Sequence, residues 1–489
     1  MQPSKPSVTQ ALNQRSKKMT EFDLAIRGGK VCTTANTINC DIGIRDGRIV
    51  AIAEKIDGAT REIDASGLLV LPGGIDAHVH ISQPAGDGIV MADDFMSATR
   101  SAMAGGTTTV MPFALQQKGD SLRAVVEDYH RQAEGNLFTD VSFHLIVTDP
   151  TPQVLGQELP ALVKDGYTSF KVFMTYDDMM LSDGELLDVF DVAKRENALV
   201  MVHAEGHDAI RYLTRKLEER GQTQPYYHGV SRPQIVEREA THRAISHAEL
   251  IDLPIVIVHV SGSEAMEQIQ WARNRGRTVF AETCPQYIAL TQDDMRGLNM
   301  DFEGAKYVCS PPPRDHESQE AIWRGIQDGT FDIFSSDHSP FRYADSQGKD
   351  RPGARTSFKW IPNGIPGIET RLPILFSEGV SKGRISLERF VALTSTNPAK
   401  LYGLAPRKGS IAIGADADIT LWDANKKVTI SQSLLHHGSD YTPYEGMAVT
   451  GWPVLTMLRG KTVADDGHIV GDPGFGTHLF RSPSNDRIR

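Results

Sequence analysis

Eight short apolar segments alternate with longer segments of helical spacing through the middle of the chain. The apolar segments cover residues 74–80, 107–113, 141–147, 168–174, 199–203, 255–260, 277–282 and 331–337. Short apolar segments separated by helix-length stretches are typical of parallel strands that crossover helices connect. The pattern predicts an α/β protein with a (β/α)8 TIM-like barrel, and periodicity alone also fits an open doubly wound sheet.

Both ends of the chain show a different pattern, in which apolar and polar residues alternate. It runs through residues 22–71 and returns at 409–422 and 454–463. Turn dipeptides such as Asp46-Gly47 between alternating runs predict antiparallel hairpins. Because neither end is long enough to bury two faces alone, we predict one small β-sandwich domain built from both chain ends.

Four units follow from these patterns. We expect the β-sandwich to take residues 19–72 and 405–468, and the catalytic barrel to take residues 73–404. Residues 1–18 are polar, contain four lysines or arginines, and should form a disordered N-terminal extension. The C-terminal tail, residues 469–489, contains Gly471-Asp-Pro-Gly-Phe-Gly, which has little local structure to hold it. We therefore expect this tail to lie across a neighbouring subunit.

Composition narrows the class of protein and of partner. The 489 residues are 40% hydrophobic and 23% charged, as in globular proteins. A formal net charge of -11 argues against nucleic acid or an anionic membrane as the main partner. The four cysteines show no CxxC spacing, and no apolar run reaches the roughly 18 residues of a membrane span. We expect free thiols, a cytoplasmic location and a small-molecule partner.

Candidate metal ligands stand near the carboxyl ends of the predicted strands. They are His78 and His80 in the first segment, Lys171 in the fourth, His203 in the fifth, His259 in the sixth and Asp337 in the eighth. The carboxyl ends of barrel strands converge on one face, so this placement favours the barrel over the open sheet. Imidazole and carboxylate are usual ligands of zinc, and the spacing of His78 and His80 points both rings to one side of a strand.

Lys171 is the most informative of these residues. It alternates with Phe170 and Val172, so its side chain should point into the barrel, where an unpaired ammonium group is costly. A buried ion pair with a carboxylate is the simpler interpretation. A cation beside metal ions would be repelled, however, whereas a lysine with a lowered pKa can react with CO2 to give an anionic carbamate.

Longer motifs around these residues give the chain a family resemblance. They include Leu71-Pro-Gly-Gly-Ile-Asp-Ala-His-Val-His, Ser169-Phe-Lys-Val-Phe-Met, Met201-Val-His-Ala-Glu, Val258-His-Val-Ser, Ser335-Ser-Asp-His, Cys309-Ser-Pro-Pro and Ile361-Pro-Asn-Gly-Ile-Pro-Gly. Across residues 22–477 the chain resembles the dihydropyrimidinase/hydantoinase family of the amidohydrolase superfamily. The resemblance implies two Zn²⁺ ions per subunit, with manganese or cobalt as alternative metals, and a homotetramer or homodimer.

The resemblance also assigns roles to single residues. His78, His80 and Asp337 would hold one metal, His203 and His259 the other, and Lys171, as N6-carboxylysine, would bridge them. Asp337 would also carry the proton to the leaving nitrogen, and Tyr176 would hydrogen-bond the developing oxyanion. Backbone groups of Ser310 and Asn363 would hold the amide edge of a cyclic ureide or imide. The expected reaction hydrolyses the ring amide of dihydropyrimidines or hydantoins to N-carbamoyl amino acids.

Several segments depart from the family pattern and leave alternatives open. The loop at residues 81–91 is rich in glycine, Gly206-His207 replaces the usual Asn-Gly, and residues 341–360 are longer and more charged than is common. An allantoinase or a cyclic-imide hydrolase is therefore the alternative enzyme, and a non-catalytic scaffold is the alternative of another class. Dihydroorotase is disfavoured because Ser82 stands where that enzyme carries its carboxylate-binding arginine.

Overall fold

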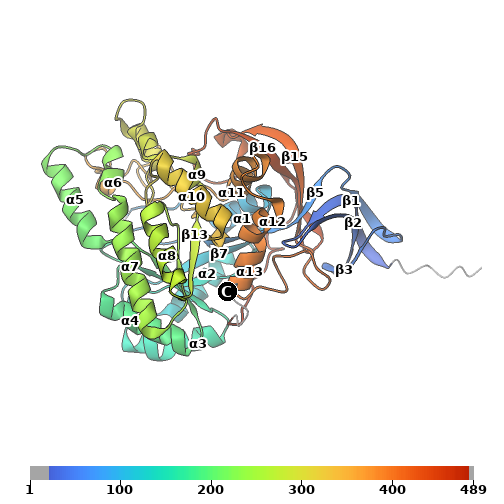
Figure 1. Ribbon diagram of the computed structural model, residues 1–489, viewed down its shortest axis with the longest axis horizontal. Coiled ribbons are helices and arrows are strands. Elements are labelled where there is room, and N and C mark those ends of the chain that lie inside the picture. Colours follow the sequence, from blue (N-terminus) through green and yellow to red (C-terminus); the bar gives the residue numbers. More distant parts are fainter. Residues whose placement is uncertain (1–20, 87, 484–489) are drawn as a thin grey trace, which may run out of the picture.

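The computed structural model describes residues 21–86 and 88–483, so the predicted N-terminal extension at residues 1–18 lies outside the described residues. Figure 1 shows two parts: a barrel wrapped by helices, and a sheet to one side that contains β1, β2, β3 and β5. The fold class that the sequence predicts is confirmed by this arrangement.

The barrel uses the eight apolar segments as parallel strands. Their bounds are β6 Gly74–Val79, β7 Thr107–Leu115, β8 Asp140–Val141, β9 His144–Ile146, β10 Ser169–Phe173, β11 Leu199–His203, β12 Ile255–Ile257, β13 Val279–Thr283 and β14 Ile333–Phe334. Strands β8 and β9 are two pieces of the third strand, and both pair with β7. A parallel bridge between Val79 and His338 joins the last strand to the first and closes the ring.

Helices cover the outside of this ring. They are α1 Phe95–Ala104, α2 Leu122–Ala133, α3 Leu159–Lys164, α4 Asp183–Arg195, α5 His207–Glu219, α6 Tyr226–Val230, α7 Gln234–Ile251, α8 Ser263–Asn274, α9 Gln286–Ala289, α10 His316–Asp328, α11 Arg371–Leu375, α12 Leu387–Val391 and α13 Asn397–Leu401. Helix α4 shows why the sequence starts a helix where it does: the Ser182 hydroxyl accepts from the Glu185 amide, and the Glu185 carboxylate accepts from the Ser182 amide. Its buried face, with Leu186 and Phe190, packs towards the strands.

The second sheet draws its strands from both ends of the chain. They are β1 Phe22–Cys32, β2 Thr37–Arg45, β3 Arg48–Ala53, β4 Ala59–Asp64, β5 Leu69–Pro72, β15 Ile419–Thr429, β16 Ala448–Leu458, β17 Lys461–Asp465 and β18 His468–Ile469. The ends meet at β5, which pairs with β1 on one side and β15 on the other. Asp46 and Gly47, with φ of 52° and 72°, form the tight turn between β2 and β3 that the sequence predicts.

The C-terminal tail packs against its own barrel. The Leu479 amide donates to the carbonyl of Val141, and the Val141 amide donates to the carbonyl of Thr477. The buried Arg481 guanidinium donates to the Phe143 carbonyl at 2.6 Å. Residues 477–481 are therefore held against the chain's own barrel, and a contact of the tail with a neighbouring subunit stays a prediction.

Two expectations from composition concern cysteines and membrane spans. All four cysteines are buried and free of disulfides, as expected. Among the described residues, no helix combines the length and the apolar character that crossing a membrane requires.

A buried ionic cluster joins the barrel to the sheet. The Lys408 ammonium lies 2.6 Å from a carboxylate oxygen of Asp140, 3.0 Å from Asp416 and 2.6 Å from Asp418. Arg459 pairs with the other Asp140 oxygen. Asp140 begins β8 of the barrel, whereas Asp418 directly precedes β15 of the sheet, so the cluster fixes one part on the other.

We expect Lys408→Met to destabilise the protein strongly. The substitution leaves buried carboxylates without their shared cation, a change that costs about 3–5 kcal/mol in comparable buried clusters. Urea denaturation measures the loss. Lys426→Met is the control, since Lys426 pairs with the exposed Asp466 and an exposed pair contributes about 1 kcal/mol or less. Equal losses in the two variants would contradict a structural role for the cluster.

Candidate functional site

The strand ends bring all six predicted ligand residues to one point of the barrel. His78 and Lys171 are completely buried, and His203, His259 and Asp337 are nearly so. The His78 Nε2 atom lies 3.1 Å from Asp337 Oδ1, and the His80 Nε2 atom lies 3.4 Å from the same oxygen. These three residues form one compact group whose ligand atoms all lie within 4.8 Å of one another.

The other two histidines form a second group beside the first. His259 Nε2 and His203 Nδ1 face each other at 2.9 Å. The rings of His78 and His259 are 5.4 Å apart between centroids, so the two groups are neighbours. The Lys171 amine reaches the same centre, because its Nζ lies 3.3 Å from His78 Nε2.

The donor atoms fit divalent metal ions. Burial, together with the nearby Lys171, holds the pKa of His78 well below its ordinary value, and burial does the same for His259. Neutral imidazoles present lone pairs, which are what a metal ion requires. With the Asp337 carboxylate, they form an N/O donor set of the kind that zinc binds.

Three neighbouring side chains orient the histidines. His78 Nδ1 contacts a Glu282 carboxylate oxygen at 2.6 Å, and His203 Nε2 contacts Glu205 at 2.7 Å. His80 Nδ1 contacts the side-chain oxygen of Gln83 at 2.7 Å. In each case the opposite ring nitrogen is left pointing to the shared centre, which is how outer partners orient metal-binding imidazoles.

Glu282 and Glu205 are not among the site residues that the sequence predicts, although both carry a signal. Glu205 stands two residues after His203 in the motif Met201-Val-His-Ala-Glu, and Glu282 lies near the end of the seventh apolar segment. A carboxylate near the carboxyl end of a barrel strand faces the same centre as the ligands on the other strands. The rule that located the histidines would therefore have located Glu282 as well.

Backbone strain gathers at this centre. His259, Asp337 and Tyr176 have positive φ values of 42°, 51° and 75°, a region that side chains other than glycine rarely occupy. Each residue lies two or three positions beyond the end of a strand, where the chain leaves the barrel. Such conformations cost roughly 1–3 kcal/mol each and persist where the surrounding structure imposes them, which is typical of functional sites.

Lys171 lies among aromatic rings and imidazoles. Burial lowers its pKa to about 8, while Asp337 and Glu282 act in the opposite direction. Its Nζ lies 5.3 Å from the centre of the Phe113 ring and 5.2 Å from that of Phe173. The inward orientation that the sequence predicts is therefore correct, and the amine is far easier to deprotonate than a lysine in water.

The three predicted substrate-binding residues also meet. Tyr176 is hydrogen-bonded to the side chains of Ser310 and Asn363, although the three residues lie far apart in the sequence. Burial raises the pKa of Tyr176, so its hydroxyl remains a donor at neutral pH. The Tyr176 ring faces Arg232, whose guanidinium carbon lies 5.7 Å from the ring centre and which donates to Glu205 at 3.0 Å.

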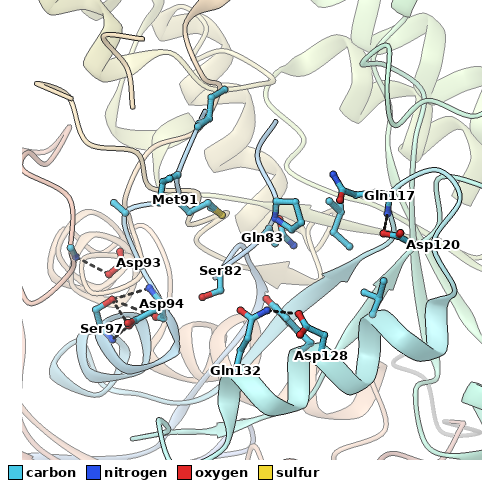
Figure 2. Close-up of a pocket in the computed structure, with 18 of the residues that line it drawn as sticks. Ser82, Gln83, Met91, Asp93, Asp94, Ser97, Gln117, Asp120, Asp128 and Gln132 are labelled. Carbon is cyan, nitrogen blue, oxygen red and sulfur yellow. Dashed lines mark hydrogen bonds between the residues drawn. The ribbon is translucent and has the colours of Figure 1, made fainter. Parts of the chain in front are cut away.

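A cavity of about 890 Å³ lies beside the loop that follows His80. Figure 2 shows Ser82, Gln83 and Met91 on the loop side and Asp128 and Gln132 of α2 below. Gln83 links the cavity wall to the centre, since it contacts His80 through its oxygen and donates to the Phe113 carbonyl at 2.6 Å. The position of this loop is therefore tied to His80 of the first group.

Comparisons with known proteins agree with this geometry. Residues 69–463 match the model of the Amidohydrolase family. The chain is 46% identical to a D-hydantoinase of Geobacillus stearothermophilus, covering 94% of this chain and 96% of the relative. It is 44% identical to a D-hydantoinase of Ralstonia pickettii, covering 94% and 99%. The crystal structure of a dihydropyrimidinase from Brevibacillus agri NCHU1002 is 42% identical and superposes with a TM-score of 0.91, covering 94% of this chain and 98% of that one.

Proposed function

This chain belongs to the amidohydrolase family and is a hydrolase of cyclic amide bonds; from that premise we propose that it is a two-metal hydantoinase or dihydropyrimidinase. The reaction would hydrolyse the ring amide of a hydantoin or dihydropyrimidine and release an N-carbamoyl amino acid. The observation that carries the proposal is the convergence of two histidine groups and Lys171 beside the Tyr176, Ser310 and Asn363 cluster.

Each part of the donor set has an assigned role in this proposal. His78, His80 and Asp337 would hold one zinc ion, and His203 and His259 would hold the other, with manganese or cobalt as alternative metals. The Lys171 amine would attack the carbon of CO2 and release a proton, which gives a carbamate with two oxygens to bridge the metals. The lowered pKa of Lys171 supports this step, because only the neutral amine can attack.

The residues of the chain would divide the chemistry between them. Bound zinc supplies Lewis acidity, which polarises the carbonyl and activates water. Asp337 would accept a proton from the attacking water and pass it to the ring nitrogen as the ring opens. Tyr176 would donate a hydrogen bond to the oxygen of the former carbonyl, where negative charge develops. Ser310 and Asn363 would hold the amide edge through backbone groups, so that the carbonyl faces the metal centre.

Cellular context and substituent preference belong to the same proposal. We propose a cytoplasmic enzyme that assembles as a homotetramer or homodimer, and the free buried cysteines fit a reducing compartment. The Gly-rich loop at residues 82–90 would set tolerance for the ring substituent, because residues at both of its ends line the cavity and Gln83 contacts His80. The names of the relatives favour the D-enantiomer of 5-substituted hydantoins.

Metal content tests the two-metal assignment. We expect about two zinc-like ions per chain by elemental analysis of the purified protein. Lys171→Ala should lower this content and abolish hydrolysis, and short-chain carboxylic acids added with the metal should restore part of both. Normal metal content and turnover in Lys171→Arg would refute the carbamate, since a guanidinium group cannot form it.

Tyr176→Phe tests the oxyanion contact. We expect kcat for hydantoin to fall by about 10²–10³, the typical cost of removing one donor to an oxyanion, with a small change in KM. Tyr402→Phe is the control, because the Tyr402 hydroxyl is buried and has no hydrogen-bond partner among the described residues. A kcat for Tyr176→Phe within threefold of wild type would rule out the assigned role.

A hydrolysis panel tests the substrate class. The panel contains dihydrouracil, hydantoin, both enantiomers of 5-phenylhydantoin, succinimide, allantoin and dihydroorotate. Dihydrouracil or hydantoin should give the highest kcat/KM among the substrates without a ring substituent. Dihydroorotate should be poor, because its carboxylate meets Ser82 and not an arginine, which costs of order 1–3 kcal/mol of desolvation. If dihydroorotate or allantoin exceeded both dihydrouracil and hydantoin in kcat/KM, the assignment would be wrong.

A further inference from the structure

Lys349 is a second completely buried lysine near the site, and it is not a ligand candidate. It belongs to residues 341–360, the segment whose length and charge depart from the family pattern. Within the described ranges, no carboxylate lies within ion-pair distance of its amine, which donates to two backbone carbonyls. Burying a lysine without an anion costs free energy unless its amine is hydrogen-bonded. The two carbonyl contacts supply those hydrogen bonds.

The two carbonyls belong to the segments that carry the substrate-binding residues. Lys349 Nζ lies 2.7 Å from the carbonyl oxygen of Val308 and 2.7 Å from that of Pro362. Val308 stands two residues before Ser310, and Pro362 directly precedes Asn363. The amide of Gly364 also donates to the Val308 carbonyl at 3.1 Å, so the two segments already touch where the amine joins them.

The segment around Ser310 is fixed from its other side by a histidine. The ring of His228 contacts the Cys309 carbonyl at 2.9 Å through Nε2, and the same atom lies 3.3 Å from the Ser310 hydroxyl. Burial holds the pKa of His228 down to about 3, so the ring is neutral and Nε2 can donate to the carbonyl. Ser310 is therefore held between His228 and Lys349, while Tyr176 contacts both Ser310 and Asn363.

The Lys349 amine can donate to both carbonyls whether it is charged or neutral. Burial lowers the pKa of Lys349 to about 7, and a neutral amine still carries two N–H donors for the two carbonyls. The contact therefore needs no charge and no counter-ion. The side chain reaches both carbonyls because its own backbone is anchored, with the Lys349 amide donating to the Arg342 carbonyl at 2.8 Å.

We propose that Lys349 is a positioning residue that fixes the spacing between the Ser310 and Asn363 segments and thereby sets the affinity for the amide edge of the substrate. This inference rests on the proposed function, since it assumes that these two segments bind the ring. The amide edge is common to all substrates, whereas the ring substituent meets the loop at residues 82–90. Lys349 should therefore act alike on every substrate, and the loop should act selectively.

Lys349→Met tests the proposal, because it keeps an unbranched, buried side chain and removes the donors. In metal-loaded enzyme we expect KM to rise about tenfold for both hydantoin and 5-phenylhydantoin, with kcat within threefold of wild type. Lys349→Arg, which keeps N–H donors, should recover most of the KM. Lys408→Met is the matched control: it also removes a buried lysine, and it should lower the unfolding temperature with no selective change in KM.

Each outcome decides one question. Unchanged KM in folded Lys349→Met, with active wild-type enzyme, would overturn the positioning role. A KM change for one substrate only would do the same, since it would place Lys349 in substituent selection. If Lys349→Met does not fold, Lys349→Gln replaces it: its shorter side chain holds the N–H donors away from the two carbonyls, and KM should rise alike for both substrates. Wild-type enzyme that hydrolyses none of the panel would refute the proposed function itself, which is a separate result.

Discussion

Lys171 places an amine inside a closed barrel next to the imidazoles of two histidine groups, and the site is organised around this contact. The barrel supplies the constraint, since its closure through Val79 and His338 fixes where every strand ends. Burial disfavours the charged forms of these groups, so it lowers the pKa of His78 and of Lys171. The nearby Lys171 amine lowers the pKa of His78 further. Neutral imidazoles and a neutral amine keep lone pairs that are available to cations other than protons.

Two surrounding carboxylates orient the histidines of this centre. Glu282 and Glu205 each engage the outer nitrogen of one histidine, so the inner nitrogens stay directed at the shared space. Glu205 also receives a hydrogen bond from Arg232, which lies against the ring of Tyr176. The histidine groups and the Tyr176 ring are thus parts of one connected set, and His259, Asp337 and Tyr176 within it all have positive φ values.

The sequence predicted the parts of this site that depend on strand periodicity. The eight apolar segments, the inward direction of Lys171 and the shared face of the histidines all follow from regular geometry. Lys349 could not be found in this way, because it lies in an irregular loop where no period fixes the direction of a side chain. The ionic cluster around Lys408 was missed for a related reason: it depends on how the barrel and the sheet pack, and sequence patterns within one element do not specify that contact.

Lys408, Lys349 and Lys171 are all buried, and each amine has different neighbours. These neighbours explain why the pKa values of the three amines differ. Lys408 lies among carboxylates, which raise its pKa and keep it charged, so it serves as a structural cation. Lys349 faces carbonyls, has a pKa of about 7, and serves as a donor with or without a charge. The pKa of Lys171 lies between those of the other two lysines. Nearby carboxylates raise it, but they do not offset the lowering that burial causes. The lowered pKa alone does not distinguish Lys171 from Lys349. Their surroundings do, since the Lys171 amine faces an imidazole at the strand ends, whereas the Lys349 amine is engaged by two backbone carbonyls.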